Sequence, residues 1–135
     1  MLHAAATFLS KNNKENYECK IDKSTKLPFI GIHKAVESII QLMSADDIQS
    51  KLRTFNIEEV SLTPNDIIRI LQKEFPKFNI SYNIEEKLQS VADTWPDSLN
   101  CEKAKKEWSF SNKHDKKSFF MEYLIPTVKE YYGRH

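Results

Sequence analysis

Glycine is scarce in this chain of 135 residues, and that scarcity limits what the chain can fold into. The two glycines, Gly31 and Gly133, stand alone, whereas an average chain of this length has about nine. Loops that hold nucleotide phosphates need several closely spaced glycines, because backbone N–H groups must approach the ligand. The sequence therefore excludes a dinucleotide fingerprint and a P-loop, and we expect no cofactor to be bound by this chain alone.

The composition is that of one globular domain or a part of one. The chain has 20 Lys and Arg against 19 Asp and Glu, so it has no strong field for nucleic acid or an anionic membrane. No apolar run approaches the roughly 18 residues of a membrane span. Cys19 and Cys101 are isolated, and the opening residues lack a secretory signal. We therefore expect reduced, packed thiols and an intracellular location, cytoplasmic or in the mitochondrial matrix.

The periodicity of the apolar residues predicts helices that alternate with short strands. Thr63-Pro64-Asn65-Asp66 is a strong helix start, with Thr63 as a hydroxyl N-cap, proline at the first helical position and an acid in the first turn. Pro76 should end that helix. The other expected helices are 4–10 and 36–43, and the expected strands are 17–21, 26–30, a segment within 51–60 through Phe55 and Ile57, and 78–84.

Two tryptophans dominate the stretch from Val91 to Phe110. A helical stripe ends at Trp95, and Pro96 stops that helix. Ser98 or Asn100 can cap a second short helix, on which one face carries Cys101, Ala104 and Trp108. The spacing predicts that both tryptophans anchor a packed corner, with Trp108 and Phe110 in the core.

The last predicted helix begins at Asp115 and carries an aromatic stripe. Pro126 should kink or split this helix. Helices with a few short strands make an α/β pattern. Each strand has one polar face, and such strands are few for so many helices. We therefore interpret residues 1–135 as a single partial domain, without a dinucleotide-binding domain.

Several spaced segments resemble one family. Ala92-Asp93-Thr94-Trp95-Pro96, followed by Lys106-Glu107-Trp108-Ser109-Phe110, resembles the C-terminal segment of the short-chain-type L-threonine 3-dehydrogenases. The resemblance runs from about Tyr17 to Phe120 and implies the C-terminal, substrate-binding part of an extended short-chain dehydrogenase fold. The further matching stretches, in the same order, are Leu27–Ile32 with the helix to Met43, Arg53–Ile57 with Ser61–Pro64, and Pro76–Tyr82.

The resemblance implies a function for the complete enzyme, and we do not expect this chain to perform it alone. In that family, L-threonine is oxidised to 2-amino-3-ketobutyrate with NAD+ as the hydride acceptor. The family's Tyr-x-x-x-Lys pair is absent here, because no tyrosine in the sequence has a lysine four residues later. We expect no catalytic, cofactor or metal residues, and the four scattered histidines lack metal-ligand spacing. The expected partners are L-threonine or a similar small amino acid, and the missing N-terminal domain or a second copy.

Trp95 is the one candidate site residue, as a wall of the pocket that would close over a small amino acid; simple packing beneath Pro96 is the alternative. The carboxylate pairs Glu58-Glu59 and Glu85-Glu86 are interpreted as solvated surface. The sequence also departs from the family: Gly31 stands where tyrosine is common, and His33-Lys34 where Pro-Asp is common, so the next helix lacks an acidic cap. Two other functions stay open, a non-catalytic truncated paralogue that acts as a protein-interaction module, and a segment of a related sugar-nucleotide epimerase.

Overall fold

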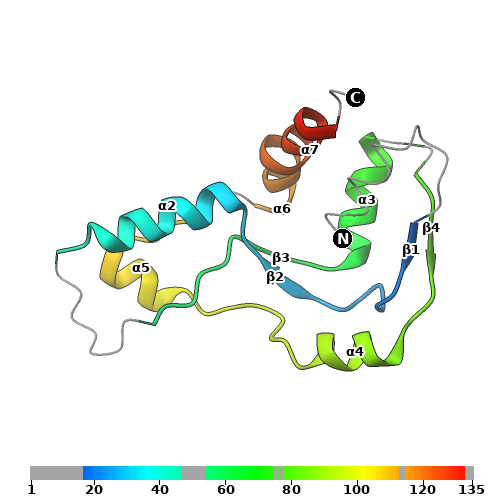
Figure 1. The fold of residues 1–135 in the computed structure, drawn as a ribbon, viewed down its shortest axis with the longest axis horizontal. Coiled ribbons are helices and arrows are strands. Elements are labelled where there is room, and N and C mark those ends of the chain that lie inside the picture. Colours follow the sequence, from blue (N-terminus) through cyan, green and yellow to red (C-terminus); the bar gives the residue numbers. More distant parts are fainter. Residues whose placement is uncertain (1–16, 47–53, 75, 77, 113–114, 133–135) are drawn as a thin grey trace.

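The computed structural model describes residues 17–46, 54–74, 76, 78–112 and 115–132. It has the expected α/β character, with helices and short strands alternating along the chain (Figure 1). The helix expected at 4–10 lies outside the described residues. The elements are β1 (Tyr17–Cys19), β2 (Leu27–Phe29), α2 (Ile32–Met43), β3 (Val60–Leu62), α3 (Pro64–Glu74), β4 (Ile80–Tyr82), α4 (Glu86–Asp93), α5 (Glu102–Trp108), α6 (Lys116–Ser118), the π-helix η1 (Phe119–Leu124) and α7 (Ile125–Tyr132).

The described strands form two separate two-stranded sheets. β1 pairs in parallel with β4, with Tyr17 opposite Ile80. β2 pairs antiparallel with β3, with Leu27 opposite Leu62. Parallel strands cannot be joined by a tight turn, so the β1–β4 pair brings together segments that are far apart in the sequence.

The strand predicted through Phe55 and Ile57 is wrong. Residues 54–58 have no regular secondary structure, and the strand β3 begins only at Val60. Phe55 contacts Trp108 of α5 edge-on, with ring centroids 5.8 Å apart. The alternation of apolar and polar residues here comes from side-chain packing against α5, and not from a strand ladder.

The buried apolar residues form two clusters. The larger cluster includes Phe78 and Phe120 and draws on β3, α3, η1 and the start of α7. The smaller cluster lies under α5, where the predicted face of Cys101, Ala104 and Trp108 is buried, as is Phe110. The two cysteines are free and buried, as predicted. The core is therefore assembled from segments spread across the whole described chain.

The predicted helix starts are confirmed at α3 and α6. At α3, the Thr63 hydroxyl accepts from the Asp66 N–H at 3.0 Å, and the Asp66 carboxylate accepts from the Thr63 N–H at 3.1 Å. At α6, Asp115 and Ser118 make the same kind of reciprocal cap. Such capping boxes satisfy N–H groups that the helix itself leaves free.

Pro126 is the second residue of α7, and the last helix changes from a π-helix to an α-helix just before it. Proline has no N–H to offer the carbonyl four residues earlier. The turn before it is a π-helix, in which the Ile125 N–H bonds the Phe120 carbonyl five residues back.

The carboxylate pair Glu58-Glu59 is not solvated surface, so that expectation is wrong. Glu59 is buried, and its Oε2 accepts from the Gly31 N–H at 3.1 Å. Glu58 Oε2 accepts from the Leu99 N–H at 2.9 Å. Both carboxylates accept from backbone donors of other segments, Glu59 from a buried position and Glu58 from a half-buried one. Glu85 and Glu86 are exposed, as expected.

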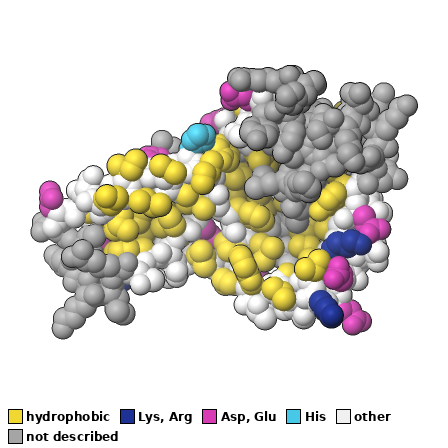
Figure 2. Space-filling model, in the orientation of Figure 1, with side chains coloured by type: hydrophobic (Ala, Val, Ile, Leu, Met, Phe, Trp, Pro, Cys, Tyr) yellow, Lys and Arg dark blue, Asp and Glu magenta, His cyan; other side chains and the backbone are white. Residues whose placement is uncertain are grey.

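Helix α2 has its apolar side turned outward. Val36, Ile39, Ile40 and Met43 share one stripe, as the sequence predicts, but they are 49–81% exposed. The buried residues of this helix are Lys34 and Ser38. Figure 2 shows hydrophobic side chains gathered over α2 and continuing across the middle of the molecule toward α4.

Candidate functional site

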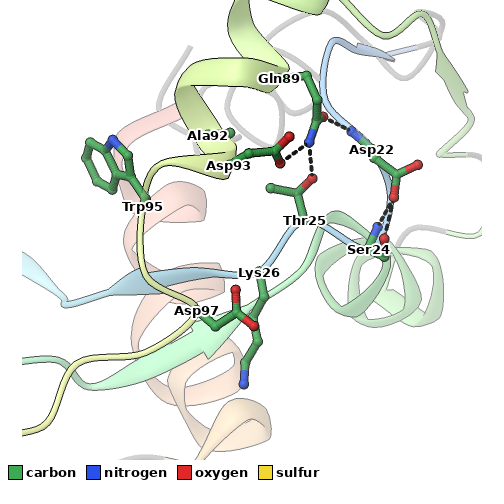
Figure 3. A pocket seen from close by; sticks show the side chains of 9 residues that line it. All are labelled: Asp22, Ser24, Thr25, Lys26, Gln89, Ala92, Asp93, Trp95 and Asp97. Carbon is green, nitrogen blue, oxygen red and sulfur yellow. Dashed lines mark hydrogen bonds between the residues drawn. The ribbon is translucent and has the colours of Figure 1, made fainter.

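A pocket of about 330 Å³ opens between the loop that joins β1 to β2 and the helix α4 with the turn that follows it. Its lining is mainly polar, with one large aromatic ring (Figure 3). Residues more than sixty positions apart in the sequence meet here. The lining residues are Asp22, Ser24, Thr25, Lys26, Gln89, Ala92, Asp93, Trp95 and Asp97.

Gln89 of α4 holds the two sides of the pocket together. Its Oε1 accepts from the Asp22 N–H at 2.7 Å. Its Nε2 donates to Thr25 Oγ1 at 2.9 Å and to Asp93 Oδ1 at 2.6 Å. One side chain therefore links the β1–β2 loop to α4 through two hydrogen bonds, while its third bond, to Asp93, lies within α4.

The β1–β2 loop is shaped by Asp22. Its carboxylate accepts from the side-chain hydroxyl of Ser24 and from the Ser24 N–H, the latter at 2.8 Å. The hydrogen bonds from the Ser24 hydroxyl and N–H favour the ionised form and lower the pKa of Asp22 below its ordinary value. Asp22 is therefore a negative charge at the pocket rim at neutral pH.

Trp95 lines this pocket but does not anchor a packed corner. Its side chain is 57% exposed, whereas that of Trp108 is 7% exposed, so the corner prediction is right for Trp108 and wrong for Trp95. No residue of α4 is buried, and Gln89 attaches this helix to the β1–β2 loop through polar bonds. The turn that carries Trp95 is fixed by hydrogen bonds from the Thr94 and Trp95 N–H groups to carbonyls of α4.

Figure 3 shows how the lining side chains are divided. Gln89, Asp93 and Thr25 point toward one another, while the Trp95 indole lies apart from this hydrogen-bonded group. Lys26 supplies the positive charge of the lining, against the carboxylates of Asp22, Asp93 and Asp97. A pocket with both charges and one aromatic wall suits a small zwitterion. The Ser24 hydroxyl donates to the Asp22 carboxylate, but the lowered pKa of Asp22 makes this carboxylate a weak base for activating a nucleophile.

The sequence singled out Trp95 in this pocket and missed Gln89, Asp22 and Lys26. Nothing in the spacing of these three residues predicts that they meet, because they come from the two segments that the β1–β4 pairing brings together. Thr63 is a helix cap, as expected, and it does not line the pocket. No three His, Cys, Asp or Glu side chains within the described ranges are grouped to hold a metal ion.

One glycine precedes a helix in the described chain, and its surroundings do not suit a phosphate. Gly31 leads into α2, but the Ile32 N–H donates to Tyr123 Oη at 2.8 Å and the Gly31 N–H donates to Glu59. The two N–H groups are already satisfied, one of them by a carboxylate that would repel an anion. The start of α2 therefore does not fit the pyrophosphate of a dinucleotide.

Comparison with known proteins finds similarity to longer enzymes. No protein-family model matches the chain. The chain is 29% identical to the mitochondrial L-threonine 3-dehydrogenase of Sus scrofa over 133 residues, which are 98% of this chain and 34% of that protein. It is 30% identical to an uncharacterized epimerase/dehydratase of Staphylococcus aureus over 114 residues, which are 84% of this chain and 36% of that protein. The chain thus spans about a third of the length of these curated relatives.

Solved structures give the same result. The L-threonine dehydrogenase of Clostridium difficile superposes with a TM-score of 0.83 and 28% identity, covering 96% of this chain and 40% of that one. The GalE-like L-threonine dehydrogenase of Cupriavidus necator, in its apo form, gives a TM-score of 0.77 and 27% identity, covering 93% and 43%.

The fold is that of the C-terminal part of the epimerase-like, short-chain type of dehydrogenase. Within that class, the chain is similar to the C-terminal segment of the L-threonine 3-dehydrogenases, as the spaced motifs predicted. Among the helices of the described residues, none has the length and apolar character to cross a membrane.

Proposed function

We propose that this chain is the substrate-binding segment of an NAD-dependent L-threonine 3-dehydrogenase and that it does not catalyse the reaction by itself. The observation that carries the proposal is that Trp95, within the Asp-Thr-Trp-Pro motif, lines a pocket that also contains Lys26 and Asp97. The similarity to L-threonine dehydrogenases over nearly the whole chain supports this choice of substrate.

The charges of the pocket match the two ends of an amino acid. The Lys26 ammonium would meet the substrate carboxylate, and a carboxylate of Asp93 or Asp97 would meet its ammonium group. The Trp95 ring would cover the short side chain of L-threonine and exclude water. The contribution of this segment is therefore to orient the substrate, which lowers the entropic part of the barrier.

The remaining parts of the reaction would come from outside this segment. In the complete enzyme, NAD+ accepts a hydride from the carbinol carbon of L-threonine, which gives 2-amino-3-ketobutyrate. The start of α2 does not fit a dinucleotide, and the chain lacks a Tyr-x-x-x-Lys pair for proton transfer. A polypeptide with the N-terminal part of the fold would supply both, in an intracellular setting where NAD+ is available.

Tryptophan fluorescence of the purified chain tests the proposal, with L-threonine and NAD+ titrated separately. We expect a saturable response to L-threonine and none to NAD+. Trp95→Phe should abolish the response, since Trp108 is buried in the smaller cluster, and Lys26→Gln should weaken binding. No NADH should form when both are present.

Two results would contradict the proposal. If the fluorescence response to L-threonine persists in Trp95→Phe, the response comes from Trp108, and Trp95 is not part of the binding site. The absence of any saturable response would mean that this pocket does not bind L-threonine. A saturable response to a nucleotide sugar would favour the epimerase alternative.

A further inference from the structure

The apolar face of α2 is a feature of the described surface that the proposed function does not explain. This face consists of Ile32, Val36, Ile39, Ile40 and Met43, whose side chains are 64%, 49%, 57%, 59% and 81% exposed. Monomeric proteins rarely expose contiguous apolar patches above a few hundred Å², and larger ones mark interaction sites.

The outward orientation of this face is fixed by the polar side of the same helix. Lys34 is buried, with its Nζ 3.4 Å from Glu37 Oε2 and 5.5 Å from the centre of the Phe110 ring. Ser38 is buried, and its hydroxyl donates to the Lys34 carbonyl at 2.6 Å. The contacts of Lys34 with Glu37 and of Ser38 with the Lys34 carbonyl lie within α2 and would turn with the helix. Turning the apolar stripe inward would, however, separate Lys34 from the Phe110 ring and expose both buried polar side chains, so rotation of the helix is opposed.

The start of α2 is held as firmly. Tyr123 of η1 accepts from the Ile32 N–H at 2.8 Å, and Glu59 accepts from the Gly31 N–H at 3.1 Å. The helix is thus tied to the core at its first residue and along its inner side. Its apolar face is a preformed surface that needs no rearrangement before it binds.

We propose that the apolar face of α2 is the docking surface for the N-terminal part of an epimerase-like dehydrogenase fold. This inference rests on the proposed function. The relatives match this chain through α2 and carry roughly two thirds of their length outside the match. A partner of that size can cover α2 and continue toward α4, where Figure 2 shows further hydrophobic side chains.

A second copy of this chain fits the face less well. A standard stable interface uses about 20–30 residues on each side, whereas a copy docked through α2 alone would offer chiefly the five residues of this face. The five exposed side chains of this face also carry no charge that would set the register of a symmetric pair.

Cysteine labelling tests the docking surface directly. This chain is fused behind the N-terminal part of the Clostridium difficile L-threonine dehydrogenase, in place of the segment that it matches. Ile40→Cys is labelled with a maleimide in the fusion and in the isolated chain. We expect labelling to be at least about tenfold slower in the fusion, because a docked face reacts only after local opening.

Met121→Cys is the matched control, an exposed methionine of η1 outside the apolar face of α2. It should label at the same rate in both proteins. The buried Cys101 reports folding, since it stays unlabelled when the smaller cluster is intact.

A second experiment applies if Cys101 reacts in the fusion, which would mean that the fusion is not folded. This chain and the N-terminal part of the Clostridium difficile enzyme are then co-expressed as separate polypeptides, with a purification tag on the Clostridium part. Co-purification of the unsubstituted chain and its loss in Ile40→Glu then supports the proposal, and the absence of co-purification overturns it.

Equal labelling of Ile40→Cys in a folded fusion and in the isolated chain would overturn the proposal. Protection in the isolated chain that grows with its concentration would assign the face to a second copy and would also overturn it. The experiment uses neither L-threonine nor NAD+. Failure of the docking proposal can therefore be distinguished from failure of the proposed L-threonine binding, because the fusion can show a protected α2 face even when the pocket does not respond to L-threonine, and the pocket can respond when the face is not protected.

Discussion

At the scale of single residues, the Tyr123 ring occupies the space that a side chain at position 31 would need. A Cβ atom on Gly31 would lie 2.7 Å from Tyr123 Cε1. The Tyr123 ring is held by its hydrogen bond to the Ile32 N–H and by packing against Phe119, with ring centroids 5.4 Å apart. The glycine thus leaves room for the ring whose hydroxyl caps α2, which has no acid in its first turn.

We expect Gly31→Ala to lower the free energy of unfolding by about 1–3 kcal/mol, because the Tyr123 ring must move and release the helix cap. The φ angle of Gly31 is −69°, which alanine adopts freely, so backbone strain does not contribute. In a Tyr123→Ala background the same substitution should be neutral or slightly stabilising. Urea unfolding of the four proteins gives the coupling, and additive effects would show that the two residues are independent.

At the scale of elements, the start of α3 is also a junction with α6. The Asp66 carboxylate caps α3 through Thr63 and accepts from Lys116 Nζ at 2.8 Å. Burial raises the pKa of Asp66, but the hydrogen bonds from Lys116 and Thr63 outweigh it and leave the pKa below its ordinary value of 3.8. The ionised form of Asp66 therefore stabilises the folded chain.

Asp66→Asn should lower the free energy of unfolding by about 1 kcal/mol at pH 7, the size of a lost helix cap. A carboxyl with a lowered folded pKa stabilises the fold above its unfolded pKa, and this stabilisation is lost as the pH falls through the folded pKa. The difference between the two proteins should shrink as the pH falls below 3.8 and disappear once the pH is below the lowered folded pKa, which urea unfolding at several pH values can measure. Glu74→Gln, at the other end of α3, is the control, and a constant difference across the range would refute the assignment.

At the scale of the whole molecule, the larger cluster joins the middle of the chain to its C-terminal helices. Phe120 is fully buried within it, among residues of β3 and α3. We expect Phe120→Ala to cost about 3–5 kcal/mol, a large part of the about 5–15 kcal/mol that stabilises a typical domain. Met121→Ala, next to it but exposed, should change stability by less than about 0.5 kcal/mol. Thermal unfolding compares them, and similar losses in both would place Phe120 outside the core.

The sequence predicts those parts of this molecule that depend on local chemistry. The cap at Thr63 and Asp66, the cap at Asp115 and the buried face of α5 follow from spacing alone. Periodicity shows that α2 has an apolar stripe but cannot tell which way the stripe faces. The Gln89 bridge was missed because its partners are 64 and 67 residues away. The strand predicted through Phe55 and Ile57 was wrong because both side chains pack against the cluster under α5, and this packing gives the same alternation of apolar and polar residues as a strand.

The π-helix before Pro126 changes how the end of the chain must be aligned with its relatives. Phe119, Phe120, Leu124 and Ile125 are all buried, a repeat of five residues where an α-helix would repeat after three or four. A π-turn is equivalent to an α-helix with one residue inserted. A relative whose last helix is wholly α-helical therefore aligns correctly beyond this point only when a single-residue gap is placed between Phe119 and Leu124.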